Sequence, residues 1–310
     1  MTSATKGALA GVLCYALWGF FPAYFPLLEP AGPVEILAHR ILWTLVVMLM
    51  VLAVRGEFGR LRGLDRSTLL TLLAAAAFIS VNWGVYVYTV NSSRVSEAAL
   101  GYFVNPLVSV LFGVLFFGER LRRVQVVAVA VAVVAVLVLT VGYGHVPYLS
   151  LTLAASFGLY GVMKKRVRLP ATVSLTAEVL LTAPFALAFL AWLHHDGSGT
   201  FTGRGGGHAA MLASAGVVTA VPLLLFGVAA QRIPLALVGM LQYITPVLQL
   251  CWAVFAVGEV LDATRWAGFV LVLVAVLLFS GGPLLATARE RRAGGPGARD
   301  SVADRVGGGT

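Results

Sequence analysis

The sequence AALGYFVNPLVSVLFGVLFFGERL at residues 98–121 has a weaker copy, VGMLQYITPVLQLCWAVFAVGEVL, at residues 238–261. Asn105-Pro106 corresponds to Thr245-Pro246, and Glu119 to Glu259, both at a shift of 140 residues without a gap (246 − 106, 259 − 119). Each copy exceeds the roughly 20 apolar residues that a helix needs to cross a bilayer. The match therefore predicts a membrane protein made of two related halves.

The composition excludes a soluble enzyme. Of the 310 residues, 59% are hydrophobic and 11% are charged, whereas a soluble globular protein is about a quarter charged and under half apolar. The mean hydropathy is +0.92, so most side chains must face lipid or other apolar helices. Cys14 and Cys251 both lie in apolar stretches, which excludes a disulfide framework, an iron–sulfur cluster and a cysteine zinc site.

Ten apolar stretches are long enough to be membrane helices. They cover residues 7–28, 33–54, 68–90, 96–117, 124–142, 147–163, 171–193, 209–230, 235–257 and 264–284. We therefore predict an all-α integral membrane protein of ten transmembrane helices, with a first five-helix repeat at 1–142, a second at 143–285 and a disordered cytoplasmic tail at 286–310. The glycine-rich loop at 194–208 is predicted to be a flexible connector.

The basic residues predict the orientation of these helices. With the N-terminus inside, 18 of the 22 Lys and Arg residues fall in cytoplasmic segments, and only Arg94, Arg204 and Arg265 fall outside. Both termini are then cytoplasmic, and the net charge of +9 needs no nucleic acid to explain it. Because five is an odd number, the second half enters the membrane upside down, as in the inverted repeats of secondary transporters.

Two prolines lie near the middle of equivalent spans. Pro106 and Pro246 each remove the helical hydrogen bond to the carbonyl group four residues earlier, at Tyr102 and Gln242. Freed carbonyl groups are costly in lipid, so these helix breaks are expected to face a cavity or a partner helix. The alternative is that the prolines only kink the helices for packing.

The second span carries ionisable residues. Glu35, His39 and Trp43 share one helical face at four-residue spacing, and Arg40 lies beside them. A charge at the centre of a membrane helix costs about 2.5–3.5 kcal/mol, so it usually marks a pathway or an ion pair. We expect Arg40 and His39 to serve the substrate or the outer gate. The alternatives are that Arg40 snorkels outward and pairs with Glu35, and that His39 either senses protons or simply packs.

Further polar and aromatic residues lie inside the spans. Glu178 in the seventh span is expected to play a role on the inner side related to that of Arg40. The full predicted substrate-binding set is Trp18, His39, Arg40, Trp43, Asn82, Tyr86, Tyr102, Asn105, Glu178, Gln242 and Tyr243. Any one of the uncharged residues alone is more often an interhelical hydrogen bond or a packing aromatic. The run His194-His195-Asp196 could bind a metal, but solvation in an exposed loop is the preferred interpretation, and no metal or cofactor is expected.

Five motifs resemble one known family. They are Leu17-Trp18-Gly19-Phe20-Phe21-Pro22, Glu35–Trp43, Asn82-Trp83-Gly84-Val85-Tyr86, Ala98–Leu107 and Leu241–Pro246. Together they are similar to the RarD group of the EamA family, within the drug/metabolite transporter superfamily, over about residues 6–282. One departure is Val126, where the family leads us to expect an aromatic residue.

This resemblance implies a permease of the bacterial cytoplasmic membrane that moves a small metabolite or amphiphilic drug by alternating access. The bilayer and a small-molecule substrate are the expected partners, protons are a candidate coupling ion, and a homodimer is a candidate assembly. The other classes left open are a non-transporting membrane sensor or scaffold and an intramembrane enzyme. An enzyme would need paired carboxylates, a nucleophile with a base, or histidines at ligand spacing, and the sequence shows none of these sets.

Overall fold

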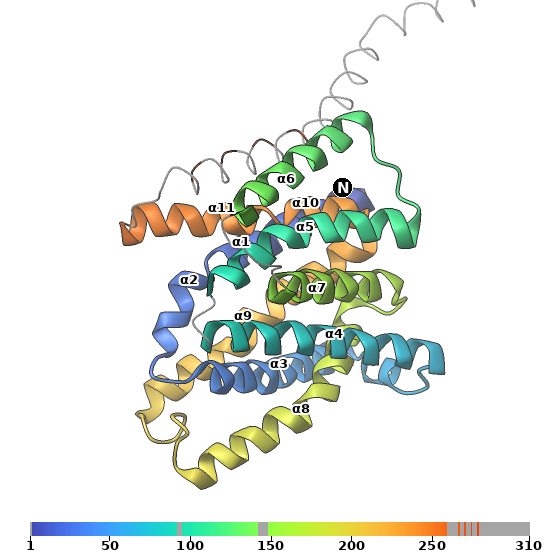
Figure 1. The fold of residues 1–310 in the computed structure, drawn as a ribbon. Coiled ribbons are helices and arrows are strands. Elements are labelled where there is room, and N and C mark those ends of the chain that lie inside the picture. The colour runs from blue at the N-terminus through green and yellow to red at the C-terminus, as the bar shows by residue number, and fades with distance from the viewer. Residues whose placement is uncertain are drawn as a thin grey trace, which may run out of the picture.

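The computed structural model describes residues 2–91, 95–141 and 148–258, together with residues 266, 270, 274 and 278. These residues are predominantly helical and contain no strand (Figure 1). Seven helices in the described part are long and apolar enough to cross a membrane. The predicted class, an all-α membrane protein, is confirmed. The predicted count of ten is not tested, because the tenth span lies almost wholly outside the described residues.

The helices agree closely with the predicted spans. The first half contains α1 (Ser3–Gly19), α2 (Phe21–Tyr24), η1 (Phe25–Leu28), α3 (Pro33–Arg55), η2 (Phe58–Leu61), α4 (Arg66–Asn91), α5 (Val95–Phe117) and α6 (Arg123–Val141). The second half contains α7 (Tyr148–Arg166), α8 (Ala171–Asp196), α9 (Gly205–Arg232), α10 (Leu235–Leu241), α11 (Ile244–Cys251) and the π-helix η3 (Trp252–Val257).

Proline and glycine set the helix ends. Pro33 is the first residue of α3, where its missing N–H costs nothing, and Gly56 ends this helix with a positive φ of 65°. In the same way, Pro170 precedes α8 and Gly197 ends it with a φ of 72°. These local signals explain why the spans could be read from the sequence.

Two predicted spans are interrupted. In the first predicted span, α1 ends at Gly19, and the chain continues as the short helices α2 and η1. The ninth span breaks at Gln242 and Tyr243, where the N–H groups bond to carbonyls only three residues back. This break lies just before Pro246, which occupies the third position of α11, where its missing N–H is not needed.

Pro106, by contrast, does not end its helix. α5 continues through Pro106 from Val95 to Phe117. Close packing supports the helix there, because Gly239 of α10 lies against the Pro106 carbonyl oxygen and Ser109. The predicted pair of equivalent breaks is therefore observed in the second half only.

Helices from both halves pack against one another. The contacts are most extensive for α5 with α7, α1 with α9, α3 with α8 and α9, and α4 with α7. Figure 1 shows α8 beside α3 and α7 beside α5. Each of these pairs places a first-half helix against α7, α8 or α9 of the second half, so the two halves share one core rather than forming separate domains. Buried aromatic side chains of Tyr15, Phe157, Tyr160 and Phe226 lie at its centre.

Close approach of α5 and α10 gives a first testable prediction. A Cβ atom at Gly239 would lie 2.7 Å from Ser109 Cβ and 2.8 Å from the Pro106 carbonyl oxygen. Gly239→Ala is therefore expected to destabilise the protein by about 1–3 kcal/mol through overpacking. Gly84→Ala is the matched control, because nothing lies within 4 Å of a Cβ there, and it should be neutral or slightly stabilising. Thermal unfolding of both variants in detergent tests this, and equal midpoints would contradict it.

Candidate functional site

Arg40 is surrounded by aromatic rings in the N-terminal half of α3. Its Cζ atom lies 5.2 Å from the ring centre of Trp83, 5.5 Å from that of Phe25 and 5.9 Å from that of Phe21. Its Nε donates a hydrogen bond of 2.9 Å to Thr219 Oγ1 on α9. A desolvated guanidinium gains about 2 kcal/mol from an aromatic face, so the rings hold the cation in place of an acidic partner.

No acidic side chain in the described part of the chain forms an ion pair with Arg40. Glu35 is engaged elsewhere, because its Oε1 accepts from the Thr200 N–H at 2.7 Å and from Thr200 Oγ1 at 3.1 Å. The alternative that Glu35 neutralises Arg40 is therefore wrong. Among the described residues, the cation is held inside the bundle without a counter-ion of its own.

Two predicted residues complete this environment. Tyr86 of α4 and Tyr102 of α5 have ring centres 6.0 Å apart, and both phenol groups lie within electrostatic range of Arg40. We call this group the Arg40 site; it comprises Phe21, Phe25, Arg40, Trp83, Tyr86, Tyr102 and Thr219. Thr219, Phe21 and Phe25 were missed as site residues, since nothing in their own sequence context shows which helix face meets Arg40.

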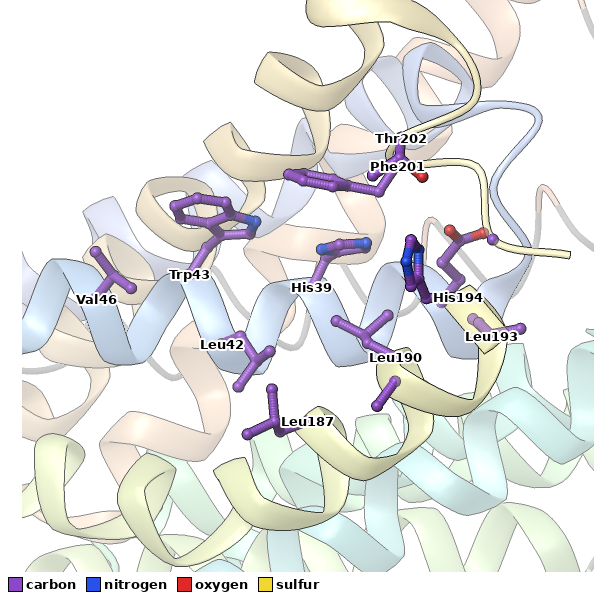
Figure 2. A pocket seen from close by; sticks show the side chains of 13 residues that line it. His39, Leu42, Trp43, Val46, Leu187, Leu190, Leu193, His194, Phe201 and Thr202 are labelled. Carbon is purple, nitrogen blue, oxygen red and sulfur yellow. The ribbon is translucent and has the colours of Figure 1, made fainter. Parts of the chain in front are cut away.

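His39 and Trp43 belong to a different surface of α3. Together with Glu35 they line a pocket of about 460 Å³ between α3, the C-terminal part of α8 and the following loop. The His39 ring stacks on Phe201 with centres 4.7 Å apart, and Figure 2 shows Phe201 beside His39 and Trp43, with Leu187 and Leu190 on their other side. The structure therefore separates His39 from Arg40 instead of joining them in one site.

The loop between α8 and α9 contacts α3. Thr200 bonds Glu35 and forms a 2.8 Å contact with His208 Nε2, and Phe201 covers His39. A buried carboxylate needs hydrogen-bond donors, and the loop supplies them to Glu35. Within the predicted flexible connector, Thr200 and Phe201 therefore pack against one end of α3, while most of its other residues are exposed. The described residues contain no group of three metal-ligating side chains, at His194-His195-Asp196 or elsewhere.

Glu178 forms a buried ion pair. Lys164 Nζ donates to Glu178 Oε1 at 2.9 Å, and the two side chains are 0% and 3% exposed. Ser174 Oγ donates to Oε1 at 2.7 Å and Tyr160 OH to Oε2 at 3.1 Å. Glu178 lies seven residues after the first residue of α8, as Arg40 does in α3 (178 − 171, 40 − 33). The same position, counted from the start of each helix, thus holds an anion with hydrogen-bond and ion-pair partners in α8 and, in α3, a cation that forms no ion pair with a described residue.

Three other predicted residues connect helices. Asn82 Nδ2 donates to the Leu153 carbonyl oxygen at 2.9 Å and to Ser156 Oγ at 3.2 Å. Tyr243 OH donates to the Phe103 carbonyl oxygen at 3.1 Å. The Trp18 ring packs edge-on against Tyr15 and Phe157 in the aromatic core. These contacts are the interhelical ones that membrane helices use for association.

Two buried amide side chains have atoms without a hydrogen-bond partner in the described residues. Asn105 is fully buried and neither of its side-chain amide atoms has a hydrogen-bond partner in the described residues. The Oε1 atom of Gln242, at the break in the ninth span, is also without one. Unpartnered buried polar atoms are rare in folded proteins, so these amides stay candidates for contact with water or solute.

Glu119 has a structural role at the other end of α5, which gives a second prediction. Its carboxylate accepts from the N–H groups of Leu235 at 2.6 Å and Ala236 at 2.8 Å, and Lys165 Nζ lies 3.1 Å away. It therefore caps the positive N-terminus of α10. Glu119→Ala is expected to lower stability by about 2 kcal/mol, measured as a lower unfolding temperature in detergent. Asp196→Ala at an exposed helix end is the control and should have little effect; an equal loss in both would refute the cap.

The chain is similar to known proteins in sequence and in fold. The chain is 48% identical over 290 residues to "Protein RarD" of Streptomyces exfoliatus, covering 93% of this chain and 91% of that protein. It is 42% identical to "Uncharacterized transporter YojE" of Bacillus subtilis over 281 residues, 89% of this chain and 93% of the relative. A solved structure described only as "Crystal structure of protein" has a TM-score of 0.68 at 20% identity, covering 90% of this chain and 98% of that one, which shows a shared fold.

The sequence profile of one family matches the chain twice. The EamA-like transporter family profile aligns with residues 5–141 and again with residues 147–281. Together these matches cover most of the chain, and the similarity to RarD proteins extends over the same region. The chain therefore belongs to the EamA-like transporter family and is a homologue of its RarD proteins.

Proposed function

We propose that this protein is a secondary transporter of the bacterial cytoplasmic membrane that moves a small organic solute by alternating access, with the Arg40 site as its solute site. The observation that carries this proposal is a guanidinium group held inside the bundle by aromatic rings with no counter-ion among the described residues. An unpaired charge in a membrane helix is costly and is usually functional. Relatives named as transporters, and the transporter family to which the chain belongs, support the same functional class.

The two halves meet at this site. Arg40 and all five rings of the site come from the first half, whereas Thr219 comes from the second. In alternating access, one bundle rocks against the other around a fixed site. The one hydrogen bond that the described residues give Arg40 is easily broken and remade during such a movement, so Arg40 is well placed to bind solute from either side.

The proposed topology follows the same logic. Residues 1–142 and 143–285 would form two repeats of opposite orientation with both termini in the cytoplasm, and the two family matches at 5–141 and 147–281 support this division. Reporter fusions at the loops after residues 63 and 203 test it. The first fusion should report a cytoplasmic location and the second an external one, whereas the same location for both would exclude it.

Flux through proteoliposomes tests the transport function itself. Purified protein should move at least one solute from a panel of organic acids, amino acids, nucleosides and amphenicols, measured with and without a pH gradient. Dependence on the gradient would support protons as the coupling ion. A membrane sensor or scaffold would give no flux for any solute, and that outcome would reject the proposed function.

A further inference from the structure

We propose that the solute bound at the Arg40 site is a small monocarboxylate with a flat, apolar body, an inference that rests on the transport function proposed above. The carboxylate would bind the terminal nitrogens of Arg40. The flat body would lie between Trp83 and the ring pair of Tyr86 and Tyr102.

The hydrogen-bond inventory of Arg40 is the first argument. A guanidinium carries five N–H donors in a fixed fork, and in the described residues only the Nε donor has a partner, Thr219 Oγ1. The terminal nitrogens are therefore available. Two parallel N–H donors match the two oxygens of a carboxylate, which gives the strongest and most directional contact that arginine makes.

The balance of charge is the second argument. Among the described residues, the Arg40 side chain contacts the rings of Phe21, Phe25 and Trp83 and the hydroxyl of Thr219, none of which carries a charge. One positive charge is balanced by one carboxylate, whereas a phosphate dianion would leave an uncompensated charge in a desolvated site. An ammonium group on the solute would find no described carboxylate at Arg40 to pair with, so a simple acid fits better than an amino acid.

The walls of the site are the third argument. The faces of Phe21, Phe25 and Trp83 are directed towards the guanidinium, and Tyr102 keeps 37% of its surface uncovered by protein. Aromatic walls favour a flat ring that can stack or meet them edge-on at 4.5–7 Å between centres. Thr219 holds Nε, which fixes the plane of the guanidinium and hence the plane of the bound carboxylate.

Binding to purified protein in detergent tests this inference with matched probes. The probes are 3-phenylpropionate, its neutral amide 3-phenylpropionamide, phenylalanine and inorganic phosphate, with dissociation constants from isothermal titration calorimetry. The acid should bind at least about tenfold more tightly than each of the other three, and Arg40→Gln should bring acid and amide within about threefold of each other. Three results would overturn the inference. They are equal binding of acid and amide, no binding of the acid at about 10 mM, and an unchanged preference for the acid in Arg40→Gln.

A second variant covers the case in which Arg40→Gln does not fold. Thr219→Val keeps the size of the side chain and removes only the acceptor of the Arg40 Nε bond. It should weaken binding of the acid about threefold or more and leave the amide unchanged; an equal effect on both would count against the inference. Binding is measured without a gradient or a membrane, so carboxylate binding without flux would reject transport alone. Flux of a neutral or cationic solute that is unaffected in Arg40→Gln would reject this inference alone.

Discussion

Arg40→Gln is expected to reduce solute flux in proteoliposomes by about 100-fold while the protein still inserts and folds. The change removes a positive charge and its paired N–H donors and leaves a shorter, neutral side chain that is still polar. Loss of hydrogen bonds to a charged group costs up to about 3 kcal/mol, which corresponds to roughly 100-fold in rate. Initial rates for the best solute of the panel, at equal amounts of reconstituted protein, provide the measurement.

Two further variants complete this experiment. Arg40→Lys keeps the charge but loses the fork, so we expect it to retain part of the flux. Arg62→Gln, at an exposed position in the loop after η2, removes an arginine from outside the site and should transport normally. Undiminished flux in Arg40→Gln would show that the guanidinium has no part in transport.

Lys164→Met is expected to destabilise the protein by about 3–5 kcal/mol, the largest effect on stability that we predict. Glu178 lies beside Lys164 with almost no exposure, so removing the cation leaves a charged carboxylate in an apolar core. Ser174 and Tyr160 would still donate hydrogen bonds to it, but neither carries a positive charge. Unfolding temperatures in detergent should drop by many degrees.

The double variant Lys164→Met/Glu178→Leu separates charge from packing. Replacing both members of a buried ion pair with apolar side chains of similar size is often neutral, so stability should largely return. Arg168→Met is the control, because Arg168 is exposed and such changes are usually within about 0.5 kcal/mol. If Lys164→Met unfolded at the temperature of the unmodified protein, the buried pair would have no structural role.

The spans were predictable because their limits are local. Pro33, Gly56 and Gly197 mark helix ends through their own backbone preferences, and apolar length marks the rest. The breaks at Gly19 and Gln242 were not predictable to the residue, because they depend on how neighbouring helices pack. Pro106 shows the same limit, since a proline that suggested a break lies inside a continuous helix.

Site residues were found individually, but their grouping was not. Arg40 and His39 are neighbours in sequence, yet successive residues of a helix point about 100° apart and do not share a face. Arg40 therefore contacts Thr219 of α9, whereas His39 contacts Phe201 of the loop between α8 and α9. In the same way, Glu178 could be recognised as a buried charge, but its partner Lys164 lies on another helix. Contacts between helices are a property of the fold and leave no periodic signal in the sequence.

Accessibility of the Arg40 site from each side of the membrane tests the central claim most directly. In a background of Cys14→Ala and Cys251→Ala, Tyr86→Cys places a thiol beside Arg40, and Val54→Cys is a control at an exposed position near the end of α3. Labelling uses a small, anionic, membrane-impermeant methanethiosulfonate in right-side-out and inside-out vesicles. We predict that Tyr86→Cys is labelled from both sides, whereas Val54→Cys is labelled from one. Labelling of Tyr86→Cys from one side only, or from neither, would contradict alternating access at this site.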